Sequence, residues 1–279
     1  MNVSELLKLY AAGEREFRAA NLQGASLKGV DLSNINLLRA NLSNANFTGA
    51  SLSSVNLREA NLSDAILRES DLSEANLIGS NLLNANLSEA NLSNASLRAA
   101  NLSNANLSGA NLREAILSEA VLKDINLSQA ILIDANLSRT NLSNANLTGA
   151  ILEGANLTNA LIAGGNLTGA NLTNALLQGA NFTGANLSQA NLSRAKVNGT
   201  NMADVLLIGA NLRGANVSWT TLRGANLTKA NLYRAKLCWS NLTGAILVEA
   251  VLLDANLNQV NLRDANLTGA IMPNGLNHE

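Results

Sequence analysis

Cations and large aromatic side chains gather in one stretch of the sequence, residues 194–239. From Arg194 to Lys236 there are seven basic residues and a single acid, Asp204. The only two tryptophans of the chain, Trp219 and Trp239, fall in the same stretch. Guanidinium and ammonium groups bind phosphates and carboxylates, and exposed indoles pack against partner proteins or stack on nucleobases. The stretch therefore predicts an interaction patch made of Arg194, Lys196, Arg213, Trp219, Tyr233, Arg234, Lys236 and Trp239.

Residue types that perform catalysis are scarce in this chain. The only histidine, His278, and the only cysteine, Cys238, belong to no cluster with metal-ligand spacing. No glycine-rich phosphate loop of the GxxxxGK type occurs. The many serines and threonines have no histidine near them in the sequence that could act as a base. We therefore expect a protein that is not an enzyme and that holds no cofactor or metal.

The residues of the patch are positioned by a five-residue repeat. Every fifth residue from Phe17 to Met272 is apolar, and leucine fills all but eight of these centre positions. From residue 20 on, the position two before each centre is mostly alanine and never charged. The position two after each centre is here called the corner, and over corners 19–269 it is Gly 17 times and Asn eight times. Gly and Asn tolerate the positive φ of a turn, so each five residues should form a short extended side and one turn.

The remaining outward position, directly before each centre, also follows the repeat. It is Asn 32 times. Stacked amide side chains can hydrogen-bond to one another along a row. We therefore expect a structural role for these asparagines rather than a role in recognition.

The pattern A-(N/D)-L-x-x, seen as Ala-Asn-Leu-Ser-Asn at residues 40–44, resembles the repeat of the pentapeptide-repeat family. The match covers residues 17–272. The resemblance implies an all-β fold, a right-handed quadrilateral β-helix of about 13 four-sided coils with 20 residues each. It also implies a bacterial source of the cyanobacterial type. Counting in steps of 20 then places Arg194, Arg213 and Arg234 along one corner, Lys196 and Lys236 on the next side, and Trp219 and Trp239 at the following corner.

Both ends of the chain depart from the repeat. Ser4 is a candidate N-cap and Gly13 a candidate stop, so we expect a short helix over about residues 4–12 that covers the first coil. Pro273 starts a turn, and no second amphipathic helix follows it. The domains should be a capping helix over 1–16, a repeat β-helix over 17–272 and a short tail over 273–279. The thinly covered last coil predicts end-to-end self-association.

A regular solenoid without a pocket signature predicts a non-enzymatic structural or protein-interaction rod with an unidentified protein partner. A second hypothesis comes from the resemblance, because some family members imitate duplex DNA and bind type II topoisomerases such as gyrase. A mimic of this kind should be broadly acidic, whereas the acidic excess here is confined to residues 59–134, with ten acids and four bases. A third hypothesis is nucleic-acid or anion binding through the basic and aromatic patch at 194–239, against which the formal net charge of −1 counts.

The sequence also bears on the compartment. The first residues lack a basic run followed by a long apolar stretch, which argues against a signal peptide. No stretch approaches the roughly 20 apolar residues of a spanning helix. One cysteine allows no internal disulfide, which is compatible with a reducing environment. We therefore expect a cytoplasmic protein without a membrane segment.

Overall fold

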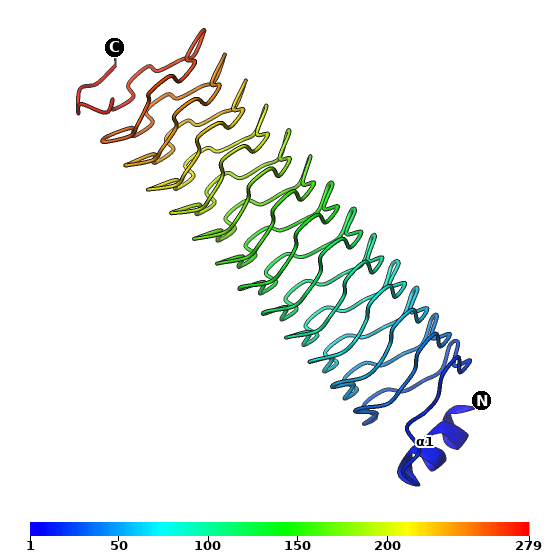
Figure 1. Cartoon of the computed structure of the whole chain (residues 1–279). Helices are drawn as coiled ribbons and strands as arrows, with labels where there is room; N and C mark the ends of the chain where they lie inside the picture. The colour runs from blue at the N-terminus through cyan, green and yellow to red at the C-terminus, as the bar shows by residue number, and fades with distance from the viewer. Residues whose placement is uncertain (279) are drawn as a thin grey trace. The chain divides into compact units, whose positions relative to one another are not determined.

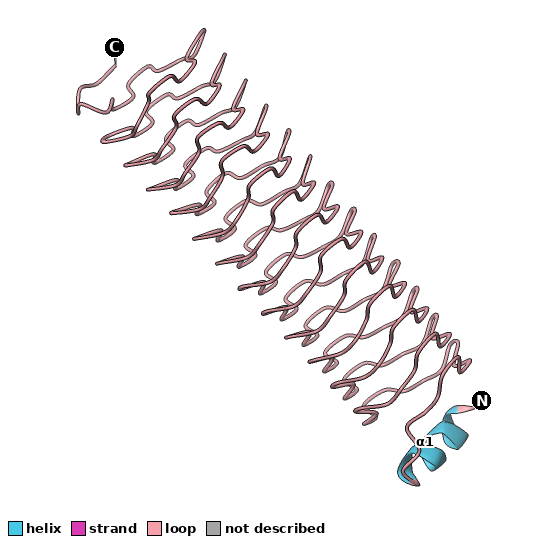
Figure 2. Ribbon diagram, viewed as in Figure 1, coloured by secondary structure: helices cyan, strands magenta, loops and turns pink. Residues whose placement is uncertain are grey.

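The computed structural model describes residues 1–278. The chain divides into two compact units, Met1–Asn141 and Leu142–Glu279. The one helix among the described residues is α1, Val3–Ala11, at the start of the first unit (Figure 1). All other described residues form turns and isolated bridges, and Figure 2 accordingly shows no strand. Each unit is described by itself below.

The helix begins one residue earlier than the sequence suggested, and its N-cap lies two residues earlier. Asn2, not Ser4, is the N-cap, because its side-chain oxygen accepts the backbone N–H of Glu5 at 2.8 Å. An asparagine carbonyl satisfies this otherwise unpaired amide as well as a serine hydroxyl does, so the first polar residue of the segment takes the cap. Gly13 follows the helix with a φ of +97°, which confirms it as the stop.

The helix packs on the first coil of its unit. Leu6 is fully buried, and the Tyr10 hydroxyl donates to the carbonyl of Ser33 at 2.9 Å. The Arg15 guanidinium lies 3.9 Å from the centre of the Tyr10 ring. The domain boundaries at residues 16 and 272 stay predictions.

Parallel bridges between residues 20 apart build both units. In the first unit they run from Glu16↔Asn36 to Val121↔Asn141, and in the second from Asn146↔Asn166 to Val251↔Ile271. We call 20 consecutive residues a coil, since each coil carries four turns, one in every five residues. The bridges stay isolated because two turn residues follow each centre, so that in every five residues only the one before the centre forms a bridge. This departs from the expectation of β-strands, although the pairing and its period are as expected.

The interior of each coil contains the two apolar positions of the repeat. Centre residues such as Leu107 and Leu187 are fully buried, and so are the alanines two positions before them, Ala105 and Ala185. A buried leucine beside a small alanine fills a narrow interior without a cavity. Where a hydroxyl replaces alanine it bonds to the backbone, as Ser70 does to the carbonyl of Leu67 at 2.6 Å.

The corners are less selective than Gly and Asn alone would suggest. Every corner from Ala19 to Gly269 has a φ between +53° and +72°. Glu, Asp, Arg, Gln, Lys, Ala, Ser and Trp all adopt this left-handed conformation here. Valine, isoleucine and threonine never occupy a corner in this range. Branching at Cβ makes a positive φ especially costly, so the repeat excludes these three types rather than requiring glycine.

The asparagine before each centre has the structural role expected of it. In one row the Asn81 side-chain amide donates to Asn61 Oδ1 at 3.1 Å and accepts from Asn101 at 3.3 Å. Asn81 Oδ1 also accepts the backbone N–H of Leu83 at 3.3 Å. The sequence did not indicate this second bond, which holds the turn residue that follows the centre. An asparagine such as Asn81 therefore links neighbouring coils and also stabilises its own corner.

The last coil of the second unit is covered less completely than the coils before it. The tail turns back, so that Asn277 pairs with Ile271 in an antiparallel bridge. The Leu276 side chain points away from the interior and is 66% exposed. Among the described residues, the amides of Leu257 and Leu262 find no backbone acceptor. The centres of this coil are therefore only half-buried, namely Leu257, Leu262, Leu267 and Met272.

Candidate functional site

The coil register gathers the predicted patch on one face of the second unit, here called the basic–aromatic face. The bridges Lys196↔Asn216 and Asn216↔Lys236 place the two lysines in one row. Arg194 and Arg234 stand two residues before those lysines, and Trp219 and Trp239 stand at the next corner. The face therefore consists of Arg194, Lys196, Arg213, Trp219, Tyr233, Arg234, Lys236 and Trp239, brought together by stacking rather than by proximity in sequence.

The two tryptophans form a stacked pair on adjacent coils. Their ring centres are 5.2 Å apart and the planes meet at 5°. Both residues are corners, with φ of +59° and +62°, so both indoles project from the surface. Trp219 is 65% exposed and Trp239 is 53% exposed. Stacking buries one indole face of each residue against the other, and the rest of this apolar surface faces solvent.

Tyr233 lies beside two arginines at the neighbouring corner. The guanidinium of Arg213 is 5.0 Å from the ring centre, and that of Arg234 is 4.9 Å from it. The ring quadrupole attracts both cations, which restricts their side chains near the surface. Arg234 also forms an ion pair with Asp254, with Nε 3.3 Å from Oδ2.

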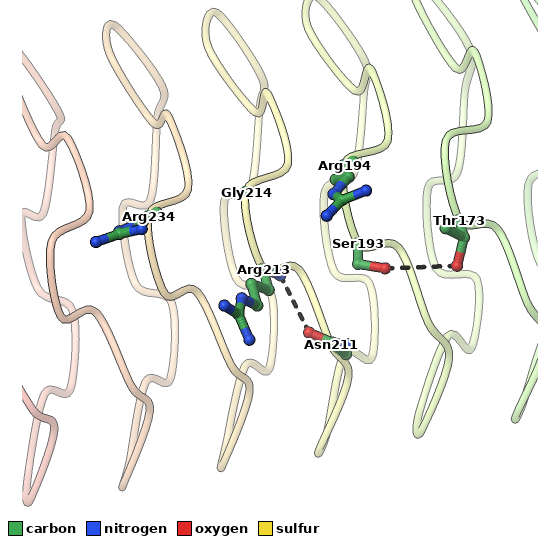
Figure 3. A pocket seen from close by; sticks show the side chains of 7 residues that line it. All are labelled: Thr173, Ser193, Arg194, Asn211, Arg213, Gly214 and Arg234. Carbon is green, nitrogen blue, oxygen red and sulfur yellow. Dashed lines mark hydrogen bonds between the residues drawn. The ribbon is translucent and has the colours of Figure 1, made fainter.

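A groove of about 500 Å³ runs along this corner across successive coils. Arg194, Gly214 and Arg234 occupy the same register in three consecutive coils, and Arg213 stands directly before the glycine (Figure 3). Ser193 and Thr173 line the groove on the side of the earlier coils, and their hydroxyl oxygens are 3.4 Å apart. The groove is thus lined by three arginines, two hydroxyl residues and Asn211, with a glycine at its middle.

Most cations of the face have no carboxylate partner. Of its five cations, Arg234 alone forms an ion pair within the described part of the chain. Arg194, Lys196, Arg213 and Lys236 therefore carry positive charge that no acid neutralises within the described residues. A cluster of unneutralised charge attracts anions and steers their approach. The face can bind negatively charged groups and planar rings. It contains no nucleophilic side chain next to a general base.

Within residues 1–278, no group of three or more histidine, cysteine or acidic side chains could hold a metal ion. Cys238 is free and half-buried beside Trp239. No helix in that range is long and apolar enough to cross a membrane.

The coil register brings the eight residues named from the sequence to one face, and their role as an interaction patch stays a prediction; the groove was not foreseen. Ser193, Thr173 and Gly214 were not singled out, because serine, threonine and glycine recur throughout the repeat. One signal was available: Gly214 is the residue between Arg194 and Arg234 when the chain is counted in steps of 20.

Comparison with known proteins identifies the family. The sequence model described as pentapeptide repeats matches in eight copies within residues 16–53, 56–94, 90–129, 120–159, 166–204, 200–237 and 239–272. The chain belongs to the pentapeptide-repeat family. Repeat proteins of this family are generally non-enzymatic structural or interaction proteins. No curated protein sequence matches the chain.

Several solved structures of pentapeptide-repeat proteins are similar to the chain. HetL of the cyanobacterium Nostoc sp. strain PCC 7120, involved in heterocyst differentiation regulation, is 36% identical over 100% of both chains, with a TM-score of 0.43. Rfr23 of the cyanobacterium Cyanothece 51142 is 38% identical over 42% of this chain and 93% of its own, with a TM-score of 0.40. A trypsin-treated variant of QnrB1, a plasmid-mediated fluoroquinolone resistance protein, is 20% identical over 69% of this chain and 90% of its own, with a TM-score of 0.40.

Proposed function

We propose that this pentapeptide-repeat protein is a non-enzymatic scaffold that docks a protein partner on its basic–aromatic face. The proposal includes the family architecture, a right-handed quadrilateral β-helix of about 13 coils, and a cytoplasmic location, where Cys238 would stay reduced. The observation that carries it is the stacked and exposed pair Trp219 and Trp239 beside unneutralised cations.

The energetics of protein interfaces support this use of the tryptophans. Tryptophan, tyrosine and arginine are the residue types most enriched where truncation weakens binding most. The face holds two tryptophans, one tyrosine and three arginines, whereas aromatic residues make up 3% of the whole chain. The Trp pair is also pre-organised, because each ring already holds the other in place, so binding would immobilise few additional rotamers.

Replacing both tryptophans with alanine tests the proposal. Ala19 and Ala99 adopt the same corner conformation, with φ of +53° and +55°, so the backbone accepts Trp219→Ala and Trp239→Ala. We expect the double variant to fold and to lose the partner captured from lysate of the source organism by the unaltered protein. Quantitative mass spectrometry of the captured proteins measures the loss.

A control variant at another corner separates this face from the general surface. Lys229 is an exposed corner of the same unit outside the face. Lys229→Ala should keep the partner that the tryptophan variant loses. Equal capture by the unaltered protein and by the tryptophan variant would remove the face as the docking site.

The last coil supports a second contact, self-association between copies of the chain. Leu276 is exposed there and the centres of the coil are half-buried, which leaves apolar surface and unpaired amides together. Sedimentation velocity over a hundredfold range of concentration should show a larger species for the unaltered protein and less of it for Leu276→Lys. A single species at all concentrations contradicts this contact.

A further inference from the structure

We propose that the groove at Gly214 binds a phosphate monoester, presented by a phosphorylated side chain of the docked protein. This inference rests on the proposed function, because it names the chemistry of the partner at the same face. The carrying observation is that Arg194, Arg213 and Arg234 line one groove, whose middle corner, Gly214, has no side chain of its own.

The glycine provides the space. Arg194, Gly214 and Arg234 are equivalent positions of three consecutive coils. Neighbouring coils lie about 4.8 Å apart, so the backbones of the two arginines are about 10 Å apart. A Cβ placed on Gly214 would meet one atom of another residue within 4 Å, the Arg194 Cγ at 3.9 Å. The corner is therefore open between the backbone positions of two arginines, and Arg213 stands directly before it (Figure 3). The Arg234 side chain points away from Gly214, and its Nε pairs with Asp254 of the next coil. A tetrahedral anion fits an opening of this width.

The charge of the groove selects a dianion. Arg194, Arg213 and Arg234 bring three positive charges, and Asp254 neutralises one of them through its ion pair with Arg234. Two positive charges remain. A phosphate monoester carries about −1.5 to −2 at pH 7 and has three acceptor oxygens, which matches both the charge and the donors. A carboxylate or a phosphodiester carries a single charge and would leave one guanidinium unpaired.

A hydroxyl at the edge of the groove is free to turn towards the ligand. Thr173 donates its hydroxyl proton to Asn171 Oδ1 at 2.6 Å. The long contact of 3.4 Å between Ser193 Oγ and Thr173 Oγ1 then leaves Ser193 as its donor. A bond of this length is weak, so Ser193 loses little when it donates to a phosphate oxygen instead. Asn211, in contrast, is occupied: it accepts from the Arg213 amide and donates to Asn191.

The extent of the groove favours a single phosphate over a nucleic-acid backbone. The row of cations is bounded by the carboxylate of Asp254 in the next coil and by uncharged Asn174 in the coil before Arg194. This strip covers three coils, which suits one isolated phosphoryl group. A nucleic-acid strand would need cations that continue along its backbone, and its phosphodiesters carry half the charge.

Fluorescence anisotropy with three labelled peptides of the same glycine–serine sequence tests the proposal. One peptide carries a central phosphoserine, the second a glutamate and the third an unmodified serine. At low ionic strength we expect saturable binding of the phosphoserine peptide and at least about tenfold weaker binding of the other two. Equal binding of the glutamate and phosphoserine peptides would overturn the preference for a dianion, and no saturable binding would overturn the site.

Variants of the groove should move the affinity in both directions. Gly214→Glu places a carboxylate between the arginines and should weaken phosphopeptide binding about tenfold, as should Arg194→Gln. Glu74 and Glu114 already adopt the corner conformation, so the glutamate is compatible with the fold. Asp254→Asn frees Arg234 and should tighten binding several-fold.

Two further measurements show which kind of molecule supplies the phosphate and whether the phosphate binds in the groove. A short oligonucleotide with a 5′-phosphate should bind more weakly than the phosphopeptide, and the reverse order would replace a protein partner by a nucleic-acid end. Arg223→Gln removes an exposed arginine of the same unit outside the groove and should leave the affinity unchanged. A loss equal to that of Arg194→Gln would reduce the effect to general charge and contradict the site.

The failure of this inference can be told apart from the failure of the proposed function. The glycine–serine peptides contain no aromatic residue, so Trp219→Ala with Trp239→Ala should leave their binding unchanged while it abolishes capture of the partner. Partner capture that depends on the tryptophans but not on Gly214→Glu would keep the docking face and reject the phosphate site.

Discussion

The two units use one backbone for surfaces of opposite charge. Met1–Asn141 carries eleven basic and fourteen acidic residues, and Leu142–Glu279 carries eight basic and six acidic residues. In the first unit many cations lie against acids, as Arg39 and Arg68 do at 2.7 and 2.6 Å from Glu59 and Glu69. In the second unit the cations of the basic–aromatic face mostly lack such partners. The repeat therefore sets the conformation of a corner and leaves the charge of its side chain free.

A charged side chain placed in the interior of each unit tests whether the two interiors are equivalent. Of the changes considered, we expect it to lower the unfolding free energy most. Leu107 and Leu187 are fully buried centres, one in each unit. Aspartate at either site would lie among apolar side chains without a partner, so we expect each variant to lose several kcal/mol of unfolding free energy. Urea denaturation followed by circular dichroism measures the loss.

Valine provides the control for this comparison, because Val197 and Val217 already serve as centres. Leu107→Val and Leu187→Val should cost about 1 kcal/mol each, since they remove one methylene from a packed interior. A large loss in one unit and a small one in the other would show that the interiors differ.

A β-branched side chain at a corner should lower the unfolding free energy less than a buried aspartate does, and by the same amount in both units. Glu89 in the first unit and Gly199 in the second have φ of +59° and +72°. We expect Glu89→Val and Gly199→Val to lower the unfolding free energy by about 1–2 kcal/mol, because valine strongly disfavours this conformation. Asparagine at the same two sites should be close to neutral, and thermal unfolding of the four variants checks both expectations.

Reversing charges on the basic–aromatic face would make the second unit resemble the first. Arg194→Glu and Lys236→Glu leave the backbone unchanged, so each should alter the unfolding free energy by less than about 0.5 kcal/mol. Both variants should elute from a cation exchanger at lower salt than the unaltered protein, and the double variant should elute earliest. Destabilisation of more than about 1 kcal/mol would mean that these cations also support the fold.

The smallest expected effect is a pH dependence at the start of the first unit. Hydrogen bonds from the Ser33 hydroxyl and amide lower the pKa of Asp31 below its ordinary value. Because the folded-state pKa is the lower one, the contribution of Asp31 is present above the unfolded-state pKa of about 3.9 and is lost as the pH falls below that value. Between pH 6 and pH 2, the unfolding free energy of Asp31→Asn should fall slightly less steeply than that of the unaltered protein.

How far the sequence predicts the structure depends on whether a position repeats. Leu107 and Ala105 repeat a pattern, so their burial followed from the spacing alone. The register that stacks Trp219 on Trp239 followed from the same count. The N-cap was missed because Asn2 and Ser4 are both good caps and only the start of the helix decides between them. The groove at Gly214 was missed because it depends on how three arginine side chains lie across successive coils, which no five-residue pattern encodes.

The spacing of the bridges has a consequence for how such a gene can change in length. Because each residue pairs with the residue 20 positions away, gain or loss of 20 residues keeps the neighbours of every later corner. Loss of five residues keeps the interior but moves all later residues to a different side of the coil. A five-residue deletion between Trp219 and Trp239 would separate the two indoles while the remaining centre leucines stay inside. Duplication in whole coils is thus the route by which a surface like the basic–aromatic face can be extended and inherited intact.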